Sequence, residues 1–133
     1  MKMVGGLLIS TLALATNGLQ AQDLPSFDGT WRMTMQHPDA SRPRDGEIVL
    51  KGTSGTWKIY ARKNLETINN PCVGTAFPLT ILPSTPDVAL TFRVIESEIV
   101  MGCPDFEPTM HWVTAHKLEG KTHGGTVITM ERD

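Results

Sequence analysis

The residues of this 133-residue chain that could do metal or acid–base chemistry are four histidines and a few nearby carboxylates. His111 and His116 are five positions apart, so on a β-strand they would point to opposite faces and could not bind one metal ion together. His116 and His123 could approach each other across the last predicted hairpin, with Asp105 or Glu107 near them. We interpret these groups as solvent-facing polar side chains and predict no metal site.

A pair of carboxylates, Glu96 and Glu98, falls on one face of a predicted hairpin, and such pairs can do acid–base work. Ser97 between them marks a turn, so we expect both in a solvated turn. The chain contains no G-x-S-x-G, no H-E-x-x-H and no glycine-rich phosphate loop. Because a nucleophile needs a base within reach, we predict that the protein is not an enzyme and uses no cofactor.

Two cysteines, Cys72 and Cys103, are the remaining reactive side chains. An even count in an exported chain favours one disulfide, and closing a loop of about 30 residues would stabilise the fold by roughly 3–4 kcal/mol. The alternative, a metal-binding or catalytic thiol, lacks C-x-x-C spacing. Pro71 and Pro104 stiffen the two loops, so we expect the disulfide to make one end of the fold rigid.

Binding residues are expected at this disulfide end, because loops held on a rigid scaffold are where binding function concentrates. A structural role is the alternative for each of them. The candidate ligand or partner contacts are Tyr60, Arg62, Asn70, Phe106, His111 and Trp112.

The first 21 residues have the composition of a leader. Lys2 precedes an apolar run from Val4 to Ala15, and small and polar residues follow as far as Ala21. The run is shorter than the roughly 20 residues that span a bilayer, and the pattern is typical of a signal peptide. We therefore predict a signal peptide over residues 1–21 and a single periplasmic or secreted domain over residues 22–133. An N-terminal helix that stays attached is the alternative.

Charge argues against two classes of partner. The chain has 12 Lys and Arg against 14 Asp and Glu, a formal net charge of −2, and loss of Lys2 with the leader would make the domain more acidic. Nucleic acids and anionic membranes are bound by clustered Lys and Arg. We therefore predict no nucleic-acid partner and no stable membrane insertion after the leader is removed.

Alternation of apolar and polar residues dominates the rest of the chain. Turn sequences such as Gly52–Gly55 and Pro83–Asp87 separate short runs at roughly ten-residue spacing. This pattern predicts an all-β fold of about eight antiparallel strands. The predicted runs are residues 30–36, 47–51, 56–62, 77–81, 87–95, 98–102, 109–118 and 126–132.

An open eight-stranded sheet would have two exposed edges, and closing it into a small up-and-down barrel removes them. The interior of an eight-stranded barrel is either filled or holds one small ligand, and both alternatives stay open here. The residues predicted to point inward are Trp31, Met33, Met35, Ile48, Leu50, Trp57, Ile59, Phe77, Leu79, Ile81, Val88, Leu90, Phe92, Val94, Ile128 and Met130.

The two ends of the predicted barrel carry a recognisable combination. Gly29-Thr30-Trp31 opens the first run, and Arg132 shares the inward parity of the last. This resembles the G-x-W signature of calycins, the lipocalin, fatty-acid-binding and avidin-like barrels, in many of which the Trp closes one end beneath an Arg of the last strand. The resemblance implies a calycin-like barrel with a cation–π contact between Trp31 and Arg132. A plain core position for Trp31 is the alternative.

The resemblance does not extend to a ligand. The second lipocalin signature, T-D-Y, is absent, and so are the Asn and Ser that would hold biotin. We expect an exported, non-enzymatic barrel that binds a small apolar or amphipathic ligand. The alternative is a protein-interaction module, of the inhibitor or immunity type, with a filled core and a working surface at the disulfide end. An interior cavity of about 300 Å³ or more would favour the ligand.

Overall fold

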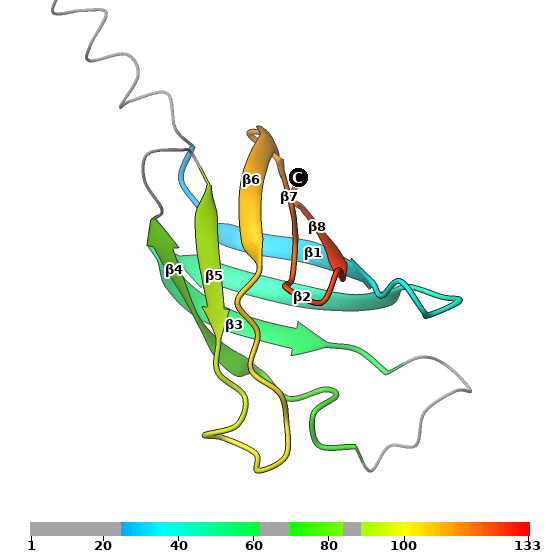
Figure 1. Ribbon diagram of the computed structural model, residues 1–133. Coiled ribbons are helices and arrows are strands. Elements are labelled where there is room, and N and C mark those ends of the chain that lie inside the picture. Colours follow the sequence, from blue (N-terminus) through cyan, green and yellow to red (C-terminus); the bar gives the residue numbers. More distant parts are fainter. Residues whose placement is uncertain (1–24, 62–69, 84–88) are drawn as a thin grey trace, which may run out of the picture.

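The structure is a computed structural model that describes residues 25–61, 70–83 and 89–133. These residues form eight antiparallel strands, each paired with the next, and the last strand pairs with the first to close a barrel (Figure 1). The predicted all-β barrel with one disulfide is confirmed, whereas the predicted signal peptide lies outside the described residues. The strands are β1 Gly29–Gln36, β2 Arg44–Lys51, β3 Ser54–Ile59, β4 Phe77–Pro83, β5 Leu90–Val94, β6 Thr109–Thr114, β7 Lys117–Lys121 and β8 Val127–Glu131. The described residues contain no helix long and apolar enough to span a bilayer.

The strand number agrees with the prediction, but two of the predicted runs were wrong. Residues 98–102, predicted as a strand, form tight turns in which the Val100 amide donates to the Glu96 carbonyl oxygen. Residues 109–118, predicted as one strand, are two strands joined by a turn, because the Thr114 hydroxyl accepts a hydrogen bond from the His116 amide (3.0 Å) and so favours a local turn.

The core follows from the alternation of side chains along each strand. Most of the predicted inward residues are buried, and Met110 and Leu118 join them from β6 and β7. Met35, Ile59 and Leu90 are only half-buried because they lie near strand ends, and Val88 lies outside the described residues. Burial of one large apolar side chain contributes about 1.5–3 kcal/mol before conformational entropy is subtracted.

The Gly-Thr-Trp tripeptide occurs twice, and glycine is needed for a different reason each time. Gly29 has a φ of +131°, which side-chain-bearing residues rarely adopt, so glycine is needed where the chain turns into β1. A Cβ atom at Gly55 would collide with the backbone of β2, so glycine lets β3 approach closely. Trp31 and Trp57 are not direct cross-strand neighbours, because Ile48 pairs with both of them in the ladder.

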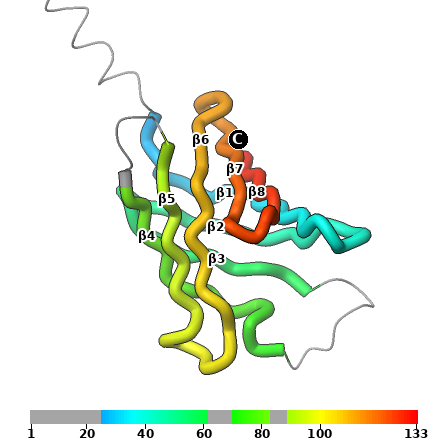
Figure 2. Tube along the Cα trace, in the orientation of Figure 1, coloured from blue at the N-terminus to red at the C-terminus, as the bar shows by residue number. Residues whose placement is uncertain are grey.

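The antiparallel topology sends the connections to two different ends of the barrel. The short turns after β2 and β6 lie at one end, where the last strand also finishes (Figure 1). We call the opposite end the disulfide end; it comprises residues 37–43, 70–76, 95–108 and 122–126. Figure 2 shows the long β5–β6 connection and the segment before β4 together at this end. A disulfide of Cys72 and Cys103 joins these two segments, as predicted.

Candidate functional site

Arg132 closes one end of the barrel. Its guanidinium carbon lies 4.3 Å from the ring centroid of Trp31 and 5.7 Å from that of Trp112. Its nitrogens donate hydrogen bonds to two backbone carbonyl oxygens, that of Asp28 (2.7 Å) and that of Ala115 (3.0 and 3.3 Å). The contact between Trp31 and Arg132 that the calycin resemblance implied is therefore present.

Aromatic stacking completes this closed end, which we define by Phe27, Trp31, Trp112 and Arg132. Phe27 stacks on Trp112 with 5.2 Å between centroids, and the Trp31 indole nitrogen donates to the Phe27 carbonyl oxygen (2.9 Å). All hydrogen-bonding groups of the Trp31 side chain are thereby satisfied. The prediction that placed Trp112 at the disulfide end was wrong. β6 begins at the disulfide end and runs away from it, so Trp112, near the last residue of the strand, lies at the closed end.

The barrel interior is occupied by side chains. Trp31, Trp57, Phe77 and Phe92 are fully buried, together with several Met, Ile and Leu side chains. Eight-stranded barrels are near the size that side chains alone can fill. The grooves described next lie on the outer wall, so neither supplies the interior cavity that a ligand-binding barrel would use.

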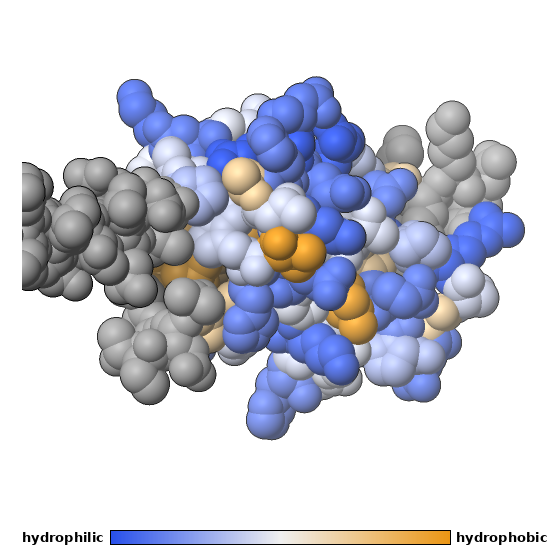
Figure 3. Space-filling view, turned by 90° about the horizontal axis from the view of Figure 1, so that it is seen from above, coloured by the Kyte–Doolittle hydropathy of each residue, from blue (hydrophilic) through white to orange (hydrophobic). Residues whose placement is uncertain are grey.

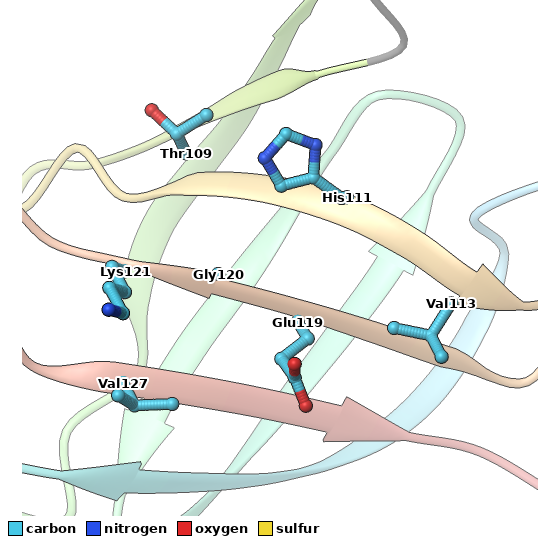
Figure 4. Close-up of a pocket in the computed structure, with 7 residues that line it drawn as sticks. All are labelled: Thr109, His111, Val113, Glu119, Gly120, Lys121 and Val127. Carbon is cyan, nitrogen blue, oxygen red and sulfur yellow. The ribbon is translucent and has the colours of Figure 1, made fainter.

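One outer groove, of about 390 Å³, crosses β6, β7 and β8 (Figure 4). The side chains that line it point outward from the three strands, whereas Gly120 lies at an inward position, where a Cβ atom would collide with Met110 and the Thr109 backbone. His111 and Glu119 are cross-strand partners in register, yet Figure 4 shows their side chains leaving the wall in different directions. His111 is thus on the wall and not at the disulfide end, where it was predicted. The lining residues are Thr109, His111, Val113, Glu119, Gly120, Lys121 and Val127.

A second groove, of about 370 Å³, lies on the outer wall beside β1 and β2. Tyr60, a predicted contact residue, belongs to it and is partly exposed. Three of its seven lining residues are charged, and one, Met33, belongs to the hydrophobic core. The lining residues are Arg32, Met33, Thr34, Asp45, Gly46, Tyr60 and Glu131.

The remaining predicted contacts are structural or undescribed. The Asn70 side-chain oxygen accepts a hydrogen bond from the Cys72 amide (3.0 Å), which shapes the turn before the disulfide. Phe106 stacks on Trp57 with 5.9 Å between centroids and covers the core from the disulfide end. Arg62 lies outside the described residues. The six predicted contacts therefore do not form one site.

Neither histidine pair is brought together. His116 lies in the turn before β7 and His123 in the turn after it, so the strand separates them. The idea that they approach each other across the last hairpin was wrong, because the predicted single strand over residues 109–118 is in fact a hairpin.

Glu96 is the feature of the disulfide end that the sequence analysis misjudged. It was expected in a solvated turn, but it is only 1% exposed. One of its carboxylate oxygens has no hydrogen-bond partner among the described residues. Its carboxylate and the sulfur atoms of Cys72 and Cys103 lie within 4.8 Å of one another. The disulfide leaves no thiolate for a metal ion, so this group is a buried acid beside a sulfur–sulfur bond.

Asp105 fixes the backbone that directs Glu96 inward. One of its carboxylate oxygens accepts hydrogen bonds from the amides of Glu96 (2.8 Å) and Ser97 (2.9 Å), and the other from the Ser97 hydroxyl (2.9 Å). These bonds lower the pKa of Asp105. Burial, and next the negative charge of Asp105, raise the pKa of Glu96 to about 7.

The raised pKa makes stability depend on pH. The folded protein holds the Glu96 proton more tightly than the unfolded chain, where the carboxyl has its ordinary value of 4.5. Its contribution is therefore complete below about pH 4.5 and is lost as the pH rises through about 7, a loss on the order of 3 kcal/mol. Glu96→Gln should abolish this decline in urea unfolding at pH 5 and pH 8. Glu98→Gln is the matched control, and an equal decline in wild type and Glu96→Gln would contradict the prediction.

Two apolar side chains of the disulfide end were also missed. Met101 is 95% exposed and Ile99 57% exposed, at the tip of the turns between Glu96 and Cys103. The apolar character of residues 98–102 predicted a strand here. The Ser97 and Asp105 side chains, which can bond to nearby backbone amides, were the signal for a turn instead.

Apolar surface is sparse elsewhere on the face that Figure 3 shows. That face is mostly hydrophilic, and its apolar side chains form small, separated spots. Scattered single apolar residues of this kind are normal on protein surfaces.

Comparison with known proteins identifies the fold alone. No protein-family model matches the chain, and no curated protein matches it. Among solved structures, the chain is similar to a redesigned β-barrel, with a TM-score of 0.50 and 18% sequence identity, over 83% of this chain and 91% of that one. The likeness agrees with the closed eight-stranded barrel described above.

Proposed function

We propose that this protein is an exported, non-enzymatic interaction module that binds a basic protein through the loop of residues 95–108, which we call the acidic loop. The observation that carries the proposal is the exposure of Met101 and Ile99 at the tip of a loop fixed by the disulfide. Exposed apolar side chains on a fixed loop are suited to burial in a partner's recess.

The filled interior favours this function over small-ligand binding. A ligand-binding barrel keeps a cavity among its inward side chains, whereas here aromatic and methionine side chains occupy that space. The grooves on the outer wall are lined largely by charged and polar residues. Both grooves are open on the outer wall, so neither encloses a small apolar ligand as an interior cavity would.

The acidic loop is held in shape before any partner arrives. Cys103 ties it to the segment before β4, and Asp105 bonds the backbone at its start. Phe106 pairs with Val94 through two backbone hydrogen bonds (2.8 and 3.0 Å). A loop that is already ordered loses less conformational entropy on binding, which favours affinity.

Charge indicates the chemistry of the partner. Residues 95–108 contain four acidic side chains and no Lys, Arg or His. Glu107 is paired with Arg93 (3.1 Å) and Glu96 is buried, whereas Glu98 and Asp105 are exposed. An acidic surface steers a basic partner and speeds its association, and the flexible Met101 side chain adapts to an irregular recess.

Paired variants test this proposal. The protein would be used to capture partners from its own cellular compartment, and the captured protein would be purified and titrated by calorimetry. Ile99→Ser with Met101→Ser should weaken binding by roughly 10-fold or more. Val113→Ser, at an apolar position on β6 whose exposure is close to that of Ile99, is the control and should change little. Added salt should also weaken binding.

Two results would overturn the proposal. One is a partner bound equally well by the loop variant and by wild type. The other is a small molecule retained by the protein in native mass spectrometry after isolation from its own compartment, which would restore the ligand-binding barrel.

A further inference from the structure

The two sulfur atoms of the disulfide are in unequal surroundings. Cys103 is 3% exposed and belongs to the core, whereas Cys72 is half-buried in the turn before β4. A thiolate that attacks a disulfide needs access to one sulfur, and the other sulfur then leaves with the electron pair. Cys72 is the more exposed residue of the two, so its sulfur is the one expected to be attacked and Cys103 the one expected to leave.

A thiolate at Cys103 would be costly without a proton source. Apolar surroundings raise the pKa of a buried thiol, because they disfavour the charged form. The neighbours of Cys103 are core side chains, and its amide is already bonded to the Val100 carbonyl oxygen (3.2 Å). The Cys103 sulfur therefore leaves faster if a proton neutralises its negative charge as that charge forms.

Glu96 is placed to supply that proton. Its carboxylate lies within 4.8 Å of both sulfurs, and one of its oxygens has no hydrogen-bond partner among the described residues. A buried carboxylate without a partner is an unfavourable arrangement that calls for an explanation. No structural role in the fold accounts for it, since Asp105 already holds the backbone of this turn.

We propose that Cys72–Cys103 is a redox-active disulfide, which exchanges with a dithiol reductant at Cys72 while Glu96 transfers a proton to and from Cys103. The proposal is independent of the interaction function above.

The exchange proceeds in two balanced steps. A thiolate of the dithiol forms a bond to the Cys72 sulfur, the bond between Cys72 and Cys103 breaks, and its electron pair goes to Cys103. The Glu96 carboxyl gives its proton to the Cys103 thiolate. The second thiol of the reductant loses its proton to water and attacks the reductant's own sulfur in the mixed disulfide; the bond to Cys72 breaks, its electron pair goes to Cys72, and Cys72 takes up a proton from water. The dithiol is oxidised to a disulfide, the protein is reduced to two thiols, and water returns the proton to Glu96.

The other carboxylates near this site are unsuited to the role. Among the described residues, Asp105 is the charged group that acts on Glu96, and its own hydrogen bonds hold it in the ionised form. Glu98 is exposed, so water would screen it from the sulfurs. Glu96 combines burial with a pKa of about 7, so near neutral pH it can both give and accept a proton.

The rate of reduction by dithiothreitol tests the proposal. Rates for the full protein would be measured between pH 5 and pH 9 and divided by the concentration of reductant thiolate. For wild type the normalised rate should fall by roughly 10-fold or more as the pH rises through about 7. For Glu96→Gln the normalised rate should not change between pH 5 and pH 9 and should stay as low as that of wild type at high pH. Glu98→Gln is the matched control and should follow wild type.

The outcomes separate proton transfer from a structural role. A flat wild-type profile would overturn the proposal, and this measurement needs no variant that folds. Faster reduction of Glu96→Gln at every pH would also overturn it, because that result would mean that the side chain only keeps the loop closed. The Ile99→Ser, Met101→Ser variant should retain the wild-type profile, so failure of the interaction function leaves this test unaffected.

Discussion

Replacing Trp31 with alanine is expected to lower the free energy of unfolding by about 3–5 kcal/mol, the usual cost of truncating a large core aromatic. The side chain is fully buried, and its indole nitrogen donates to the Phe27 carbonyl oxygen. The truncation would also leave the Arg132 guanidinium without the ring face that lies 4.3 Å away. Urea unfolding followed by circular dichroism measures the change.

A control on the same sheet distinguishes the effect of truncating a buried side chain from that of truncating an exposed one. Val49→Ala removes apolar atoms from the outer face of β2, where the side chain is partly exposed, and should change the unfolding free energy by about 0.5 kcal/mol or less. A loss below about 1 kcal/mol for Trp31→Ala would mean that the closed end is dispensable.

Removing the disulfide should have an effect of similar size. Cys72 and Cys103 are 31 positions apart in the sequence, and their bond restricts the unfolded chain. The chain-entropy model predicts a loss of about 3–4 kcal/mol for the variant with both cysteines changed to alanine. Urea unfolding at pH 5, where Glu96 is protonated, measures this loss without the charge effect of that residue.

The oxidation state is checked separately. Thiol titration of the unreduced, urea-unfolded wild type should find no free thiol. Two reactive thiols would contradict the disulfide, and a loss of stability below about 1 kcal/mol in the double-alanine variant would show that the bond contributes little to the fold. Because the disulfide joins the acidic loop to the segment before β4, partner binding should weaken in the same variant.

The fold was largely predictable because its determinants are local. A period of two along a strand assigns each side chain to a face, and this alone placed Trp31, Phe77 and Ile128 in the core. Parity also placed Arg132 on the same side as Trp31, and closure of the barrel then brought the two together. The count of two cysteines in a chain with a leader-like start was enough for the disulfide.

The candidate site depended on contacts that no local pattern encodes. Residues 98–102 are apolar enough for a strand, but Asp105 bonds to amides eight and nine positions earlier in the chain and holds them in turns. Glu96 thereby lies beside the disulfide that joins this loop to the segment before β4, and burial of its carboxyl raises its pKa. They also leave Met101 and Ile99 at the surface.

The sequence by itself therefore determined which face each strand residue occupies, that the sheet closes, and that the two cysteines pair. Only the tertiary structure decided which end of the barrel each side chain reaches, which moved Trp112 to the closed end, and what covers each turn, which buried Glu96. The physical reason is that alternation is a property of neighbouring residues, whereas the end that a residue reaches and the cover of a turn depend on strand direction and on chain segments far away in the sequence.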